Sequence, residues 1–240
     1  QAAGAGLHAA GFLCYEAAPA FDRAFVTPPP GNLPLAWFGI YDRCTRLPKL
    51  PSWPAEASET REETAGDAGL PDWSPSESDA EHRVAVERIR AFISAGDVYQ
   101  VNHTHRLRTR LSETPWNLFR RLVSAQGGRY AAWVALEDHL VCSASPELFF
   151  SLEGDRIESR PMKGTAPRGR SSREDELLGM GLSASAKDRA ENLMITDMVR
   201  NDLGRIAEIG SVCVDALWEL ERFETVWQLT STVQARTRAP

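Results

Sequence analysis

Short apolar runs and alternating polar and apolar residues predict several strands along this chain. Residues 11–18 (GFLCYEAA) and 35–42 (LAWFGIYD) are short apolar runs, and residues 96–111 (GDVYQVNHTHRLRTRL) show polar alternation. Four further runs follow at short intervals, with turn residues such as Gly154 between them, and they favour an antiparallel β meander. These runs cover residues 129–136, 139–145, 147–152 and 156–161.

Apolar positions with helical spacing, together with capping residues, predict three helices. Ser78 and Glu81 form a capping-box pair ahead of residues 85–95 (AVERIRAFISA), and Gly96 provides the stop. The other two helices are expected at residues 115–125, which Thr114-Pro115 opens, and at about residues 185–203, which end before Gly204.

A polar segment at residues 168–176 (RGRSSREDE) is interpreted as a loop between the last predicted strand and the last helix. Sequential antiparallel strands with helices inserted between them indicate an α+β fold rather than a doubly wound parallel sheet. We therefore expect largely antiparallel sheets that are flanked by helices.

The length of 240 residues and the hydrophobic content of 42% suit one large domain or two small ones. Most of the net charge of -6 comes from residues 51–80, which contain eight acidic residues and one arginine. Because this segment is rich in Pro, Glu, Ser and Gly, we expect it to be a disordered acidic insertion within a single domain. The remainder offers no basic face for nucleic acid and no Lys-rich amphipathic helix for a membrane surface.

The cysteine pattern and the N-terminal sequence predict a cytoplasmic protein. The four cysteines lie far apart and form no CxxC pair, which is typical of reduced thiols: Cys14, Cys44, Cys142 and Cys213. No run of 18 apolar residues is present, and the N-terminus has no signal-peptide pattern. Because it also lacks an initiating Met, the sequence is expected to begin inside a longer protein.

Lys163, in residues 160–169 (RPMKGTAPRG), is the first candidate for chemistry. A hairpin turning at Gly154 would bring Glu147 and Lys163 to the same edge of a sheet. A free lysine has a pKa of about 10.4, but burial lowers the pKa, so a desolvated Lys163 could act as a nucleophile or a base. The alternative is a lysine that is solvated or paired with Glu147, and the spacing leaves both open.

Asp188 and Glu191 form the second candidate cluster. They are three residues apart on a predicted helix, so both carboxylates can reach one cation. Two carboxylates suit Mg²⁺, which keeps several waters and shares its ligands with an anionic substrate. The alternative is a helix cap, with Ser185 as N-cap and Asp188 at its N3 position. The chain shows no His-based metal spacing, no GxSxG elbow and no GxxxxGK loop.

Five ordered motifs resemble those of the chorismate-utilising enzymes, over about residues 4–235 apart from the acidic insertion. They are GDVYQVN, CSASPELFF, RPMKGTAPRG, AKDRAENLMITDMVRNDLGR and FETVWQLTSTV. The resemblance implies the α+β fold of anthranilate synthase component I. Within the family, the anthranilate and isochorismate synthases usually carry Ala at position 163. The branch that serves p-aminobenzoate and folate synthesis, the aminodeoxychorismate synthase component I branch, carries Lys.

The resemblance also implies a role for each candidate residue. Lys163 is expected to attack C2 of chorismate and displace the C4 hydroxyl, after which ammonia from a glutamine amidotransferase partner adds at C4 and expels the lysine. Glu147 matches the general base, while Gly164 and Thr165 match donors to the substrate. The expected cofactor is Mg²⁺, with Glu191 as a direct ligand and Asp188 acting through water.

The sequence departs from the family pattern in three places. Gln228 stands where several relatives have a His, and Met162 replaces a common Ile. The family also continues beyond the position of Pro240 with further carboxylate-gripping and metal-binding residues. The chain is therefore expected to be part of a longer domain, with little activity and with exposed core surface. The alternative functions are an anthranilate or isochorismate synthase type and a non-catalytic binding protein.

Overall fold

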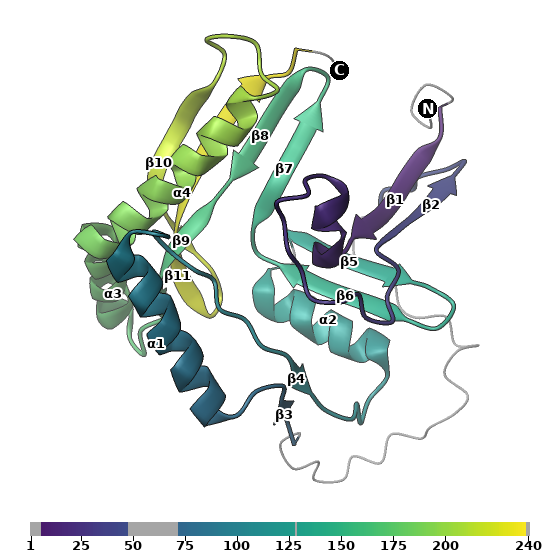
Figure 1. Ribbon diagram of the computed structural model, residues 1–240, viewed down its shortest axis with the longest axis horizontal. Coiled ribbons are helices and arrows are strands. Elements are labelled where there is room, and N and C mark those ends of the chain that lie inside the picture. The colour runs from purple at the N-terminus through teal and green to yellow at the C-terminus, as the bar shows by residue number, and fades with distance from the viewer. Residues whose placement is uncertain (1–5, 48–71, 128, 239–240) are drawn as a thin grey trace. The chain divides into compact units, whose positions relative to one another are not determined.

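The computed structural model describes residues 6–47, 72–127 and 129–238, and these fall into two compact units. The larger unit combines Gln1–Pro51 with Leu118–Pro240, and the smaller one is Ser52–Asn117. Figure 1 gives the labels of the elements. Helices alternate with antiparallel strands, so the predicted α+β class is confirmed.

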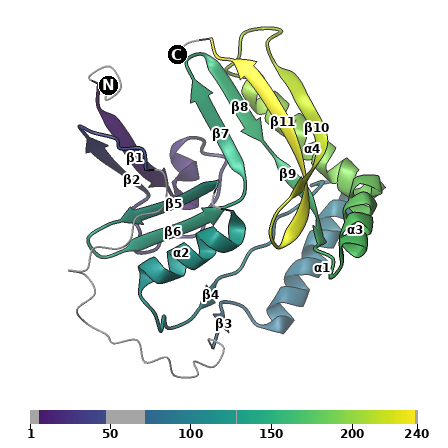
Figure 2. The same ribbon diagram turned by 180° about the vertical axis from the view of Figure 1, so that it is seen from behind.

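A five-stranded antiparallel sheet forms the centre of the larger unit. Its strands are β7 (Leu148–Glu153), β8 (Arg156–Arg160), β9 (Met162–Pro167), β10 (Cys213–Arg222) and β11 (Val226–Arg236). Figure 2 shows β11 between β10 on one side and β8 on the other. Strands β8 and β9 lie end to end along the same edge of β11, and the amide of Ser231 donates to the carbonyl of Pro161 between them at 3.0 Å.

Two helices, α3 (Ser172–Ala184) and α4 (Ala186–Gly204), pack against β9, β10 and β11. Both begin at serine N-caps, Ser171 and Ser185, whose hydroxyls accept the first free amides. The apolar core lies between α4 and the sheet, where each of its members is at most 7% exposed: Ile157, Leu203, Ala207, Val233 and Ala235. This packing fixes the position of α4 relative to β9 and β11.

The larger unit also contains two separate hairpins. Strand β1 (His8–Leu13) pairs with β2 (Ala36–Tyr41), and a 3-10 helix, η2 (Tyr15–Ala20), follows β1. Strand β5 (Tyr130–Ala135) pairs with β6 (Leu140–Ser145). The helix α2 (Pro115–Gln126) contributes Phe119, whose ring centre lies 5.5 Å from that of Trp133 on β5.

The smaller unit is built around α1 (Asp79–Ala95). Ser78 accepts from the amide of Glu81, whose side chain accepts from the amide of Ser78, so the predicted capping box is confirmed. The helix ends at Gly96 in the left-handed conformation, as expected. Strand β3 (Ser74–Pro75) pairs with β4 (Leu107–Arg108) and anchors the segment that follows the helix.

Several sequence-based predictions about the elements were wrong. Residues 15–20 form a 3-10 helix rather than the end of a strand, and residues 96–111 are a strand only at β4, because β3 offers a partner of two residues. The polar segment 168–176 contains the start of α3, since Ser171 and the amide of Glu174 form an N-cap. Strands β6 and β7 belong to different sheets, so the predicted meander is two hairpins.

The expected insertion at residues 51–80 lies mostly outside the described residues, which resume at Asp72. Its last residues take up defined structure, because they form β3 and the first turn of α1. The amide of Ser76 donates to the carbonyl of Arg106 at 2.8 Å, and the Ser76 hydroxyl accepts from the amide of Arg106 at 2.9 Å. In the described residues, no helix has the length and apolar character that crossing a membrane requires.

Candidate active site

A β-bulge on β9 places Lys163 at the edge of a pocket. Thr165 pairs with Gln228 and Met162 pairs with Thr230, so three steps along β9 match two steps along β11. Lys163 and Gly164 therefore share the position opposite Leu229. Bulges of this kind turn side chains away from the regular alternation of a strand. Lys163 is half-buried there and lines the pocket.

Gly164 makes the bulge possible for two reasons. Its φ is +92°, a conformation that side chains rarely adopt. In addition, a Cβ at this position would lie 3.0 Å from the Cβ of Asp188 and 3.3 Å from Cδ1 of Leu229. The absence of a side chain lets β9 approach α4 closely, so that Lys163 and Asp188 line the same pocket.

Glu147 reaches the same pocket from the start of β7. Leu148 pairs with Arg160, so the predicted hairpin brings the beginning of β7 beside the beginning of β9. Oε1 of Glu147 accepts a hydrogen bond of 3.0 Å from the amide of Met162. Burial of its carboxyl among the pocket walls raises the pKa of Glu147, and this outweighs the opposing effects of the Met162 amide and of the nearby Lys163 charge. A raised pKa suits a proton-transfer group.

Asp188 and Glu191 face one cation from the first turns of α4. The Nζ of Lys187 lies 3.9 Å from Oδ1 of Asp188 and 3.8 Å from Oε2 of Glu191. Both carboxylates therefore lie within 4 Å of the same ammonium group. Ser185 also donates to Oδ2 of Asp188 and accepts from its amide, so the capping role that the sequence left open is present as well. The contact with Lys187 uses Oδ1 of Asp188, whereas the hydrogen bond from Ser185 uses Oδ2.

These two carboxylates fit Mg²⁺ as partial ligands. Within the part of the chain that the structure describes, no third His, Cys, Asp or Glu ligand atom joins them. Oxygen donors and few protein ligands are typical of Mg²⁺, which retains waters and binds substrate oxygens. The Mg²⁺ site at Asp188 and Glu191 stays a prediction, which the chemistry of the donor set supports.

Asn192 is a buried residue that the sequence analysis did not single out. Its Nδ2 donates to the carbonyl of Leu229 at 3.0 Å and to the carbonyl of Lys163 at 3.4 Å, and its Oδ1 accepts from Ser231 at 2.6 Å. It is completely buried. Asn192 therefore holds α4 against the bulge of β9 and against β11, and it positions the backbone of Lys163. The amide beside Glu191 in the predicted helix was its only signal in the sequence, and Asn201 of the same helix is exposed.

Thr165 and Gln228 complete one wall of the pocket. They face each other across β9 and β11, and the Thr165 hydroxyl donates to Oε1 of Gln228 at 3.0 Å. The Gln228 amide group is thereby oriented toward the neighbouring strand. Gln228, which stands where several relatives have a His, is thus part of the pocket wall.

All six predicted site residues line one pocket of about 470 Å³. They are Lys163, Glu147, Gly164, Thr165, Glu191 and Asp188, and Gln228 lines it too. The pocket combines the amine of Lys163, the carboxyl of Glu147 with its raised pKa, and two carboxylates that both lie near the Lys187 ammonium. This set of groups is suited to proton transfer and, with a cation held by the two carboxylates, to a small anionic molecule.

A second pocket of the larger unit is mainly apolar. It has a volume of about 980 Å³ and runs between β7 and α4, where Phe149, Phe150, Ile195 and Val199 line it. The side chain of Phe149 is 84% exposed. This surface agrees with the expectation of exposed apolar residues.

The comparison with protein families matches the whole chain to one family. Residues 1–240 match the family of chorismate binding enzymes, and the chain belongs to this family. It is 42% identical over 167 residues to aminodeoxychorismate synthase component 1 of Klebsiella aerogenes, which covers 70% of this chain and 37% of that protein. It is 33% identical, over an alignment of 263 positions, to anthranilate synthase component 1 of Streptomyces coelicolor. That alignment covers 94% of this chain and 52% of that protein.

A solved structure supports the fold. The crystal structure of anthranilate synthase component I from Streptococcus pneumoniae TIGR4 aligns with a TM-score of 0.75 at 24% sequence identity. The alignment covers 97% of this chain and 57% of that chain. The expected fold is therefore confirmed, and the chain spans between about a third and a half of the length of these two curated relatives.

Proposed function

We propose that this chain belongs to an aminodeoxychorismate synthase component I, which aminates chorismate at C4 to give 4-amino-4-deoxychorismate for p-aminobenzoate and folate synthesis. The observation that carries the proposal is the convergence of Lys163, Glu147, Asp188 and Glu191 on one pocket. The similarity to aminodeoxychorismate synthase component 1 supports it.

In the proposed reaction, the neutral amine of Lys163 forms a bond to C2 of chorismate. Both ring double bonds shift, from C1=C2 to C1=C6 and from C5=C6 to C4=C5, the C4–oxygen bond breaks, and the hydroxyl leaves as water once it has gained a proton. Ammonia then adds at C4, both double bonds shift back and the bond to Lys163 breaks. Covalent catalysis of this kind divides one substitution into two easier ones.

Glu147 is proposed to accept and return the protons of these steps. Its raised pKa places it closer to neutral pH than an ordinary glutamate, which favours transfer in both directions. Its bond to the Met162 amide holds the carboxyl near the start of β9. The backbone of Gly164 and the hydroxyl of Thr165, which also line the pocket, are proposed to donate to the substrate.

Asp188 and Glu191 are proposed to hold Mg²⁺, which when bound would neutralise a substrate carboxylate. The shared contact of both carboxylates with the Lys187 ammonium supports this. The proposed partner is a glutamine amidotransferase subunit that supplies ammonia, and the proposed location is the cytoplasm.

The test is product formation from chorismate, Mg²⁺ and ammonium, followed by mass spectrometry, in this chain and in the longest natural polypeptide that contains it. Lys163→Ala and Lys163→Arg should both abolish amination, because neither side chain offers a neutral amine at pH 8. The control is Arg173→Ala, which removes an exposed cation of α3 outside the pocket, and this variant should retain chorismate amination. When ammonium is withheld, the unaltered protein should gain the mass of chorismate less one water.

The mechanism is contradicted if the Lys163→Ala protein aminates chorismate at an unchanged rate.

The second candidate function is that of an anthranilate synthase type, which the 94% coverage by the Streptomyces coelicolor relative favours. The two activities differ in their products, because anthranilate lacks the pyruvate group that aminodeoxychorismate retains. Anthranilate as the main product would replace the proposed function.

A further inference from the structure

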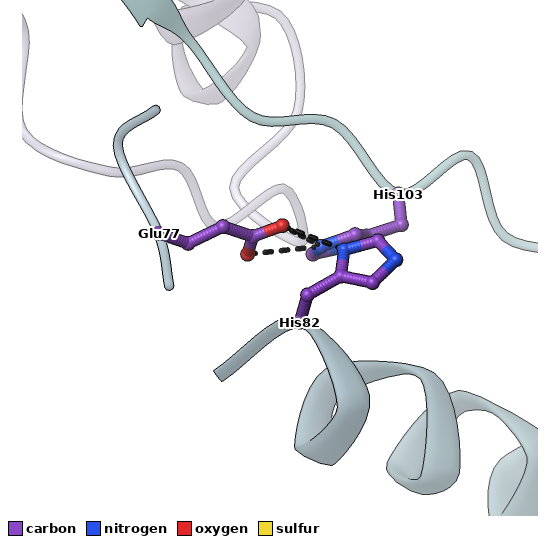
Figure 3. Close-up of side chains that lie close together, drawn as sticks. All are labelled: Glu77, His82 and His103. Atoms are coloured by element: carbon purple, nitrogen blue, oxygen red, sulfur yellow. Dashed lines mark hydrogen bonds and ion pairs between the residues drawn. The ribbon is translucent and has the colours of Figure 1, made fainter. Parts of the chain in front are cut away.

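Three histidines of the smaller unit surround one carboxylate. Nδ1 of His82 lies 2.8 Å from Oε1 of Glu77, Nε2 of His103 lies 3.0 Å from the same oxygen, and Nδ1 of His105 lies 3.3 Å from it. Figure 3 shows the Glu77 carboxylate pointing at the rings of His82 and His103. Glu77, His82 and His103 each offer a ligand atom, and these atoms all lie within 4.8 Å of one another.

The local structure explains why these side chains meet. Glu77 directly precedes the N-cap of α1, and His82 lies in its first turn, so both are at the same end of the helix. His103 and His105 are two residues apart in the segment before β4, and residues with this spacing share one face of an extended chain. Pairing of β3 with β4 brings that segment beside the start of α1.

More imidazoles converge on Glu77 than one hydrogen-bonded pair requires. A single carboxylate oxygen, Oε1 of Glu77, is approached by all three imidazoles. Nε2 of His103 also lies 3.1 Å from Oε2 of Glu77, and the rings of His82 and His103 have centroids 5.2 Å apart. Imidazole nitrogens that converge with a carboxylate are a common set of ligands for metal ions.

We propose that Glu77, His82 and His103 form a binding site for a transition-metal ion of the Zn²⁺ type, with His105 beside Glu77. Imidazole nitrogens with one carboxylate suit Zn²⁺, Cu²⁺ or Ni²⁺, whereas Mg²⁺ and Ca²⁺ prefer oxygen donors. In a tetrahedral zinc site with bonds of about 2.0–2.1 Å, neighbouring ligand atoms are about 3.3 Å apart. The distances from Glu77 to the histidines, 2.8–3.3 Å, are close to this value.

With three protein ligands, a tetrahedral site would keep a fourth position for water or another ligand. It joins the start of α1 to the segment that leads into β4, which are separated in sequence by about twenty residues. The proposal does not depend on the proposed function, because the Mg²⁺ pair belongs to the other unit.

The experiment is a titration of the chelator-treated, metal-free 240-residue chain with Zn²⁺ in competition with a chromophoric chelator. The expected result is one tightly bound equivalent, and Co²⁺ in place of Zn²⁺ should give the intense visible absorption of tetrahedral coordination. His82→Gln and His103→Gln should each weaken Zn²⁺ affinity by at least about tenfold, the effect that even supporting residues of metal sites have. The matched control is His8→Gln, which replaces an exposed histidine of β1. This variant should bind Zn²⁺ with unchanged affinity.

Two results would overturn the proposal. The first is binding that is absent, or unchanged in His82→Gln and His103→Gln, while circular dichroism shows both variants folded. The second is a thiolate-to-Co²⁺ charge-transfer band in the near ultraviolet, which would assign the ion to one of the four free cysteines. If a variant unfolds, the double variant Glu77→Gln/His105→Gln is titrated instead, and unchanged affinity there overturns the proposal as well.

Discussion

Replacement of Gly164 by alanine tests the bulge that positions Lys163. The new methyl group would lie 3.0 Å from Cβ of Asp188, 3.3 Å from Cδ1 of Leu229 and 3.4 Å from Cδ1 of Leu182. The backbone φ of +92° adds conformational strain for any residue with a Cβ. Both effects act in the folded state only, so Gly164→Ala should destabilise the protein.

The magnitude follows from three contributions. A left-handed conformation costs a non-glycine residue about 1–2 kcal/mol. Overpacking against Asp188 and Leu229 adds about 1–3 kcal/mol. The loss of backbone freedom in the unfolded chain returns roughly 0.4–1 kcal/mol. The free energy of unfolding should therefore fall by about 1–5 kcal/mol.

The assay is urea unfolding followed by circular dichroism and tryptophan fluorescence, with the slopes compared as well as the midpoints. Gly181→Ala is the matched control, because Gly181 lies in α3, where an added methyl group would meet no atom within 4 Å and φ is not left-handed. That substitution should stabilise the helix by about 0.5–1 kcal/mol. A Gly164→Ala protein as stable as the unaltered one would refute the close approach of β9 to α4.

Two other substitutions test buried polar contacts of the larger unit. Asn192→Ala should lower the free energy of unfolding by about 2–4 kcal/mol, because Ser231 and the Leu229 carbonyl lose buried partners, whereas the exposed Asn201→Ala should change it by less than about 0.5 kcal/mol. Asp175 has its pKa held well below the usual range, first by its bonds to Arg168. Its stabilisation is therefore present above the ordinary carboxyl pKa and is lost as the pH falls toward the folded-state value. The melting-temperature difference between the unaltered protein and Asp175→Asn should be largest at pH 7 and smaller at pH 3; a constant difference would argue against the ion pair.

The sequence by itself predicted those features that depend on neighbouring residues. Ser78 with Glu81, and Ser185 with Asp188, predicted where α1 and α4 begin, because an N-cap hydrogen bond spans only three residues. The turn at Gly154 predicted the β7–β8 hairpin for the same reason. The start of α3 was missed because its capping serine lies in a polar run that is equally typical of a loop.

The tertiary structure alone decided which groups meet. The buried contacts of Asn192 and the meeting of His103 with Glu77 join residues that are between 26 and 39 positions apart. The bulge opposite Leu229 joins residues of two different strands, β9 and β11. No local pattern encodes such contacts, because they result from strand register and from helix packing. The sequence therefore supplied the candidate residues Lys163 and Glu147, and the packing of β7, β9 and α4 placed them in one pocket.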